Sequence, residues 1–248
     1  MMKYYAIITL LNLLPLITGC REEIITGPVM GLITTYDQYN NAEDDMSGVE
    51  VKFLRDSMPV AGALTEPGGR YVINDLQYGK YTVGYYREGY IMSYESRIFN
   101  HVGGGVPFYI DFSLYEVPHF SVHIDSVRLL RDYMVRVFLR IDGDTVLKSK
   151  NYSYFIAFAS DSPSVSKMNY KGVGKGYFTN NLGYPYNTPV AVCGLIGDIG
   201  NIHSMASLDS VYLVVYPLAG GQGYNFDQYL DGALGQPSNI LRCKWPRR

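Results

Sequence analysis

Apolar and polar residues alternate over several short stretches in the first half of the chain. This two-residue period is typical of a strand with one buried face. Between residues 49 and 53, for example, two valines and a phenylalanine alternate with a glutamate and a lysine. Turn signals at residues 66–69, 74–75 and 76–79 separate the runs, and this spacing predicts a sandwich or barrel. Strands are expected over residues 49–53, 70–73, 80–86 and 106–114.

The alternation continues in the second half. Asp142-Gly143 is a strong hairpin turn signal, and six or seven strands suit an immunoglobulin- or fibronectin-like sandwich. Glu116-Val117-Pro118 is a candidate linker, because proline ends the preceding strand. The expected strands cover residues 120–124, 135–141, 145–148, 152–159, 190–195, 210–216 and 240–245. The pattern predicts an all-β chain with two consecutive β-sandwich domains, at residues 27–117 and 118–248.

The first twenty residues follow a different pattern. Lys3 precedes an apolar run from Tyr4 to Leu16, the length of a signal-peptide core. A membrane-spanning helix needs about 20 apolar residues, and this run also contains Asn12 and Pro15. Residues 1–19 are therefore expected to be a cleaved signal peptide, and residues 20–26 a tether.

Ile17-Thr18-Gly19-Cys20 matches the bacterial lipobox, a branched aliphatic residue and two small residues before cysteine. The resemblance implies that the Cys20 thiol carries lipid, palmitate being typical. Stable anchoring takes more than one acyl chain. Arg21-Glu22-Glu23 resembles the acid-rich signal of surface-exposed Bacteroidetes lipoproteins. The expected location is the outer membrane, lipid-anchored and exposed at the cell surface.

A resemblance to a domain family covers roughly residues 27 to 115. From Gly69 onward the chain follows G-x-Y-x-(I/F)-x-x-L-x-x-G-x-Y-x-(V/L), and Gly48–Phe53 and Gly89–Tyr90 extend the likeness. It resembles the carboxypeptidase regulatory-like, transthyretin-like β-sandwich, which carries no catalytic group. The resemblance assigns turns to Gly69 and Gly79, and core positions to Tyr71, Leu76 and Tyr81.

The order of lipobox, acidic start and two β-domains is similar to that of accessory outer-membrane lipoproteins of Bacteroidetes. Their genes often accompany SusC/SusD-type glycan-uptake systems. The resemblance implies a non-catalytic surface protein that supports glycan capture or uptake. The alternative is a structural or adhesive envelope protein that acts through a protein–protein interface.

Tyrosine is abundant, with 24 residues, and clusters in two stretches rich in glycine and amide side chains. Aromatic rings can stack on the C–H faces of sugars while amides and carboxylates hold the hydroxyl groups, and loops commonly carry binding residues. The alternative is that these rings pack against the sandwich or a partner protein. The candidate glycan-binding residues are Tyr177, Tyr184, Tyr186, Tyr224 and Tyr229.

The sequence gives little support for nucleic-acid binding, metal binding, catalysis or nucleotide binding. The formal net charge of −2 leaves no basic field for nucleic acid. His119 and His123 would lie about 13 Å apart on one strand, and no G-x-S-x-G motif occurs. The glycine-rich stretch 172–176 lacks the P-loop spacing and is expected to be a loop or hairpin tip. The acidic stretch 36–47 favours a solvated loop over a calcium site. No catalysis, metal or cofactor is expected.

Two further cysteines, Cys193 and Cys243, lie in expected strands. An oxidising envelope permits a disulfide between them. Two buried free thiols are the equally favoured alternative.

Overall fold

The fold is seen in a computed structural model, which describes residues 24–129, 135–142, 153–178, 190–192, 210–220 and 232–244. These residues form fifteen strands and no helix, so the predicted all-β class is confirmed. Within the same ranges no helix has the length and apolar character to cross a membrane.

The first unit consists of eight strands in two sheets. One sheet has the order β3-β2-β5-β6; in the other, β1 pairs with β4, β7 and β8. The strands are β1 (Thr26–Tyr36), β2 (Glu50–Arg55), β3 (Met58–Leu64), β4 (Arg70–Gln77), β5 (Gly79–Tyr86), β6 (Ser93–His101), β7 (Phe108–Tyr109) and β8 (Phe112–Tyr115). A core of buried aliphatic and aromatic residues from both sheets makes this unit a β-sandwich.

The structural roles expected from the family resemblance are confirmed. Tyr71, Leu76 and Tyr81 are each 2% exposed and belong to the core of the first unit. Gly69 and Gly79 have φ angles of +77° and +152°, a region that glycine adopts without steric cost.

Two expectations for the first unit are wrong. Residues 74–75 do not end a strand: β4 continues to Gln77, with a register shift opposite Gly27–Val29 of β1. Pro28 lies inside that shift and cannot donate to the ladder, so the polar pair marks a bulge. Residues 106–114 do not form one strand, because β7 and β8 are separate and each is parallel to β1. The alternation also fails to predict β1, β3 and β6.

The second unit is also a two-sheet sandwich. Its sheets have the orders β13-β10-β9 and β12-β11-β14-β15. The strands are β9 (Ser121–Leu129), β10 (Val135–Asp142), β11 (Ser153–Ser160), β12 (Gly172–Phe178), β13 (Val190–Val192), β14 (Ser210–Leu218) and β15 (Leu241–Lys244). Buried residues of β9 and β10 face buried residues of β11 and β14 across the core. The strand expected over 145–148 lies outside the described residues.

The prediction of a loop over residues 172–176 is wrong. This stretch is most of β12, which pairs with β11 over its whole length. A Cβ atom at Gly176 would lie 2.0 Å from the ring of Phe155. Glycine at position 176 therefore leaves room for the Phe155 ring against the strand. Because β12 has glycines at every second position, its sequence lacks the apolar–polar alternation that would have predicted a strand.

Strand β14 is buried on both faces. One face contributes to the core between the sheets, and the other, with Val214 and Tyr216, belongs to a second apolar cluster on the outer side of the sheet. That outer cluster also contains Ile91, a residue of the first unit. The two units therefore share an apolar contact.

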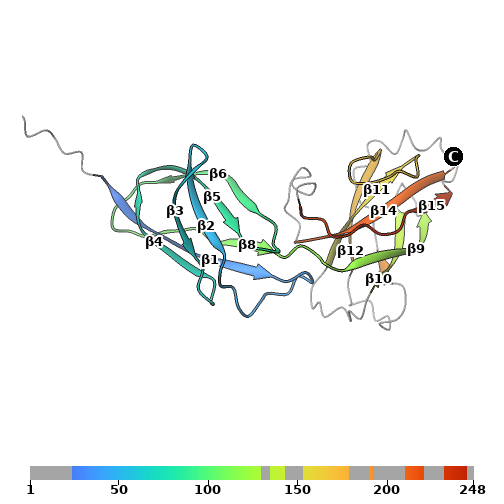
Figure 1. The fold of residues 1–248 in the computed structure, drawn as a ribbon, viewed down its shortest axis with the longest axis horizontal. Helices are drawn as coiled ribbons and strands as arrows, with labels where there is room; N and C mark the ends of the chain where they lie inside the picture. Colours follow the sequence, from blue (N-terminus) through green and yellow to red (C-terminus); the bar gives the residue numbers. More distant parts are fainter. Residues whose placement is uncertain are drawn as a thin grey trace, which may run out of the picture.

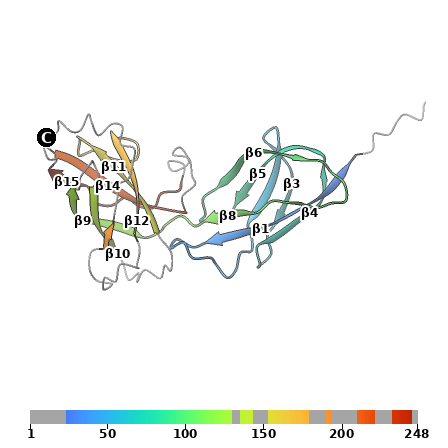
Figure 2. The ribbon, with the colours of Figure 1, turned by 180° about the vertical axis from the view of Figure 1, so that it is seen from behind.

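The two units lie end to end (Figure 1), and the reverse view shows the same order (Figure 2). Strand β1 has 11 residues, a length of about 35 Å. It begins at the end of the first unit that is far from the second unit, and it ends where the units meet. We call these two regions the outer end and the junction.

Candidate functional site

Most residues predicted to act in binding lie outside the described residues: Cys20, Tyr184, Tyr186, Cys193, Tyr224 and Tyr229. Tyr177 lies in β12, where its backbone pairs with that of Tyr154. The glycan site and the lipidation site stay predictions.

Cys243 lies in β15, where its thiol donates a hydrogen bond of 3.3 Å to the carbonyl oxygen of Val211. Burial raises the pKa of this thiol, which makes it a poor nucleophile. Because its candidate partner Cys193 is not described, the disulfide and the pair of free thiols stay open.

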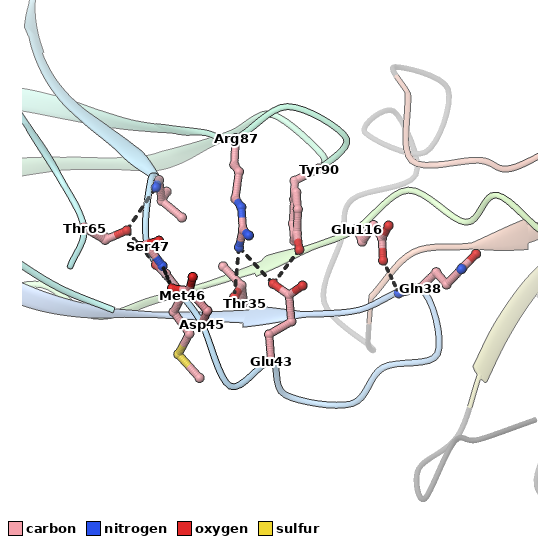
Figure 3. Close-up of polar contacts among 11 residues, drawn as sticks. Thr35, Gln38, Glu43, Asp45, Met46, Ser47, Thr65, Arg87, Tyr90 and Glu116 are labelled. Carbon is pink, nitrogen blue, oxygen red and sulfur yellow. Dashed lines mark hydrogen bonds and ion pairs between the residues drawn. The ribbon is translucent and has the colours of Figure 1, made fainter. Parts of the chain in front are cut away.

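A network of polar contacts surrounds the junction (Figure 3). The loop of residues 37–48, which we call the junction loop, begins with an Asx turn. Oδ1 of Asp37 accepts hydrogen bonds from the backbone N–H of Tyr39 at 2.9 Å and of Asn41 at 2.8 Å. These bonds fix the direction in which the chain leaves β1.

The far end of the junction loop is fixed in a similar way. Oδ1 of Asp45 accepts from the N–H of Ser47, and hydrogen bonds from Ser47 lower the pKa of the Asp45 carboxyl group. Buried Thr65 accepts from the N–H of Val49 at 2.9 Å and donates to the carbonyl oxygen of Met46 at 2.6 Å. The loop's polar groups thus hold its own backbone. No group of three or more histidines, cysteines or carboxylates in the described ranges could hold a metal ion.

Glu43 is the centre of the network. Its Oε2 accepts a hydrogen bond from the Tyr90 hydroxyl and lies 2.9 Å from Nη1 of Arg87. The guanidinium group of Arg87 lies 4.7 Å from the Tyr90 ring centroid, a cation–π contact. Burial and the adjacent Glu43 raise the pKa of Tyr90. A cation and a phenol already engage this carboxylate, so the trio is suited to holding the loop in place.

The segment proposed as a linker is bonded to the first unit. Glu116 accepts from the N–H of Gln38 at 2.8 Å, and the Gln38 side chain accepts from the N–H of His119 at 2.9 Å. The N–H of Val117 donates to the carbonyl oxygen of Gly89. These bonds connect residues 116–119 to two loops of the first unit.

Two apolar residues complete the junction. Tyr39 stacks on Phe120, with ring centroids 5.6 Å apart and planes at 7°, and it belongs to the core of the second unit. Ile91 is buried in the outer cluster of the same unit. Each side chain leaves a loop of the first unit and packs in a different cluster of the second. The arrangement can fix the two units relative to each other.

Sequence reasoning missed the junction contacts of Arg87, Tyr90, Tyr39 and Ile91, although Tyr90 belongs to the stretch that carries the family resemblance. Each stands in a loop, where no periodicity identifies it. For Tyr39 the available signal was an aromatic residue inside a largely polar and acidic stretch.

Comparisons with known proteins give only distant likenesses. No protein-family model matches the sequence, and no curated protein matches it. A DUF3823 family protein from Parabacteroides merdae is 14% identical, with a TM-score of 0.29, over 90% of this chain and 100% of its own. A Bacteroides uniformis protein with a proposed carbohydrate-binding role is also 14% identical, with a TM-score of 0.29, over 88% and 98%. The major pilin subunit of Bacillus cereus is 12% identical, with a TM-score of 0.35, over 88% and 68%. TM-scores this low carry no argument about function.

Proposed function

We propose that this chain is a non-catalytic, surface-anchored lipoprotein that holds a glycan-binding unit at a fixed distance from the outer membrane. The acylated Cys20 would anchor the chain to lipid. The first unit would be the rigid spacer. Tyrosine-rich segments of the second unit would bind a glycan or a component of a glycan-uptake complex.

The observation that carries this proposal is the end-to-end order of the two units. Strand β1 begins at the outer end, six residues along the chain from Cys20, and runs to the junction. An anchor at Cys20 would therefore attach to one end of the molecule, with the second unit at the other. A packed junction suits this role, because a loose one would leave the distance to the membrane undefined.

The glycan arm of the proposal rests on residue chemistry. Tyrosine rings and amides occur together around residues 177–186, and the stretch 224–229 adds a carboxylate, Asp227. Tyrosine offers an apolar face and a polar hydroxyl group, which suits wet sugar surfaces.

The test uses the acylated mature protein on vesicles, screened against a glycan array and by affinity gels. Saturable binding that Tyr224→Ala with Tyr229→Ala, or Tyr177→Ala with Tyr184→Ala, abolishes would support the proposal. Tyr109→Ala serves as the matched control, since Tyr109 is an exposed tyrosine of the first unit. Absence of binding over a broad panel, with no uptake component copurified from envelopes, would contradict it.

A second function, an adhesive or structural role through a protein interface, is favoured by strand β3. This strand lies at the edge of its sheet, carries no charged residue, and exposes Met58, Val60 and Leu64. Uncharged edge strands are sites where another strand can add. Val60→Lys with Leu64→Lys would then abolish adhesion while leaving glycan binding intact.

A further inference from the structure

The outer end of the first unit exposes a group of apolar side chains. Val102 and Val106 are 79% and 82% exposed, and Ile24, Ile25 and Tyr78 are each more than half exposed. We call these five residues the tip. Single exposed apolar residues are ordinary, but a group at one end of a molecule marks an interaction surface.

Backbone contacts bring the tip residues together from three parts of the chain. The N–H of Tyr78 donates to the carbonyl oxygen of Ile25 at 2.9 Å, and the N–H of Gly104 donates to that of Thr26 at 2.8 Å. The turn between β4 and β5 and the loop after β6 therefore both lie beside the start of β1, as Figure 1 shows.

The loop of the two valines packs on the start of β1 at its first glycine, where a Cβ atom on Gly103 would lie 2.6 Å from the Ile25 side chain, and it is open to solvent beyond that point. Three glycines separate Val102 from Val106. A Cβ atom on Gly104 or Gly105 would meet nothing within 4 Å. The core therefore gives no reason for two aliphatic side chains in this loop.

The short distance along the chain from the tip to Cys20 indicates that the tip's partner is the lipid bilayer. Three residues, Arg21 to Glu23, separate Cys20 from Ile24. Four extended residue steps span at most about 14 Å. A lipid on Cys20 would keep Ile24 within that distance of the membrane surface, whatever path the tether takes.

We propose that the tip rests in the interfacial region of the lipid bilayer to which Cys20 anchors the chain. This inference rests on the proposed acylation of Cys20. The side chains suit that region, where aliphatic residues enter the boundary between headgroups and acyl chains and tyrosine rings lie at headgroup level. With a second contact beside the anchor, the first unit stands in a defined orientation on the membrane.

The test places one fluorescent reporter at either end of the acylated mature protein. Trp245→Phe removes the single tryptophan. Tyr78→Trp then reports on the tip, and Met168→Trp, at a position 78% exposed in the second unit, is the control. Each protein is reconstituted into phosphatidylcholine vesicles that carry a doxyl quencher high on the acyl chain.

The expected result is quenching and a blue shift of emission at position 78, and neither at position 168. Flotation with the vesicles but no quenching at position 78 would overturn the tip contact and leave the anchor intact. Failure to float would overturn both the anchor and the tip contact. Equal quenching at both positions would also contradict the proposal, because the contact would not be specific to the tip.

A pair of variants separates lipid contact from folding. Val102→Asp with Val106→Asp should abolish quenching at position 78 without changing the circular dichroism melting curve. Val60→Asp with Leu64→Asp is the matched control, since these aliphatic residues are also exposed but lie on β3. Unchanged quenching in the first pair, or loss of quenching in the second, would contradict the proposal.

Discussion

The side chains at the two ends of the first unit differ in burial: those at the junction are packed or hydrogen-bonded, and those at the outer end are exposed. At the junction, Glu43 has two polar partners, and Ile91 is buried in the second unit. At the outer end, Val102 and Val106 project from a glycine loop and are almost fully exposed. The side chains at the junction pack against the second unit of the same chain. The exposed apolar side chains at the outer end have no such contact, and we propose that they contact lipid.

The largest effect should come from placing a charge at each end. Ile91→Asp buries a carboxylate among apolar side chains, and we expect a loss of about 3 kcal/mol or more in the free energy of unfolding. Val102→Asp should change it by less than about 0.5 kcal/mol. Urea unfolding followed by circular dichroism measures both. Equal losses in the free energy of unfolding for the two variants would contradict the burial of Ile91 and the exposure of Val102.

Truncating a tyrosine at each end should give the next largest difference. Tyr39→Ala removes the ring that stacks on Phe120 in the core of the second unit, and we expect a loss of about 3 kcal/mol. Tyr78→Ala, at the exposed outer end, should cost less than about 1 kcal/mol. Calorimetry also checks the coupling of the units: Tyr39→Ala should separate their unfolding into two transitions. A single, unshifted transition would contradict a packed junction.

The ion pair at the junction should have a smaller effect. The side chains of Glu43 and Arg87 are each 25% exposed, so solvent weakens their attraction without removing it. We expect a coupling energy of about 1 kcal/mol between Glu43→Gln and Arg87→Gln in a double-mutant cycle. Lys52 and Glu50 form a more exposed pair on β2, and the same cycle there should give a lower value. The reverse order would show that the junction pair does not stabilise the loop.

The smallest effect concerns alkaline pH. Burial and Glu43 raise the pKa of Tyr90 in the folded state, so the folded protein holds this proton more tightly than the unfolded chain does. Tyrosine in an unfolded chain has a pKa of about 10. The contribution is therefore fully present below about pH 10 and is lost as the pH rises above it. Tyr90→Phe should make the decline in stability shallower in denaturant titrations, and an unchanged slope would contradict this.

Alternation predicted the strands that have one buried and one polar face, such as β2 and β5. It missed β3 and β12 for a physical reason. Residues of β3 are uncharged on both faces, and β12 has glycines where a core strand would show large apolar residues. Packing against Phe155 selects glycine at position 176, and a single sequence does not reveal that constraint.

The junction could not be predicted because its contacts join residues far apart in the chain. Gln38 and Glu116 are separated by 78 positions, and Glu43 and Tyr90 by 47. Local patterns carry no information at such separations. The family resemblance did predict the structural glycines and core tyrosines, because those roles belong to the sandwich itself.

The most direct test of the central claim measures the distance between the two units in solution. Spin labels are attached at Gln77→Cys and Met168→Cys in the acylated protein, with Cys193→Ser and Cys243→Ala. Pulsed electron resonance should give one narrow distance distribution, which broadens when Tyr39→Ala and Ile91→Ala are added. A broad distribution in the protein without these two changes would contradict a rigid junction, and with it the proposed spacer.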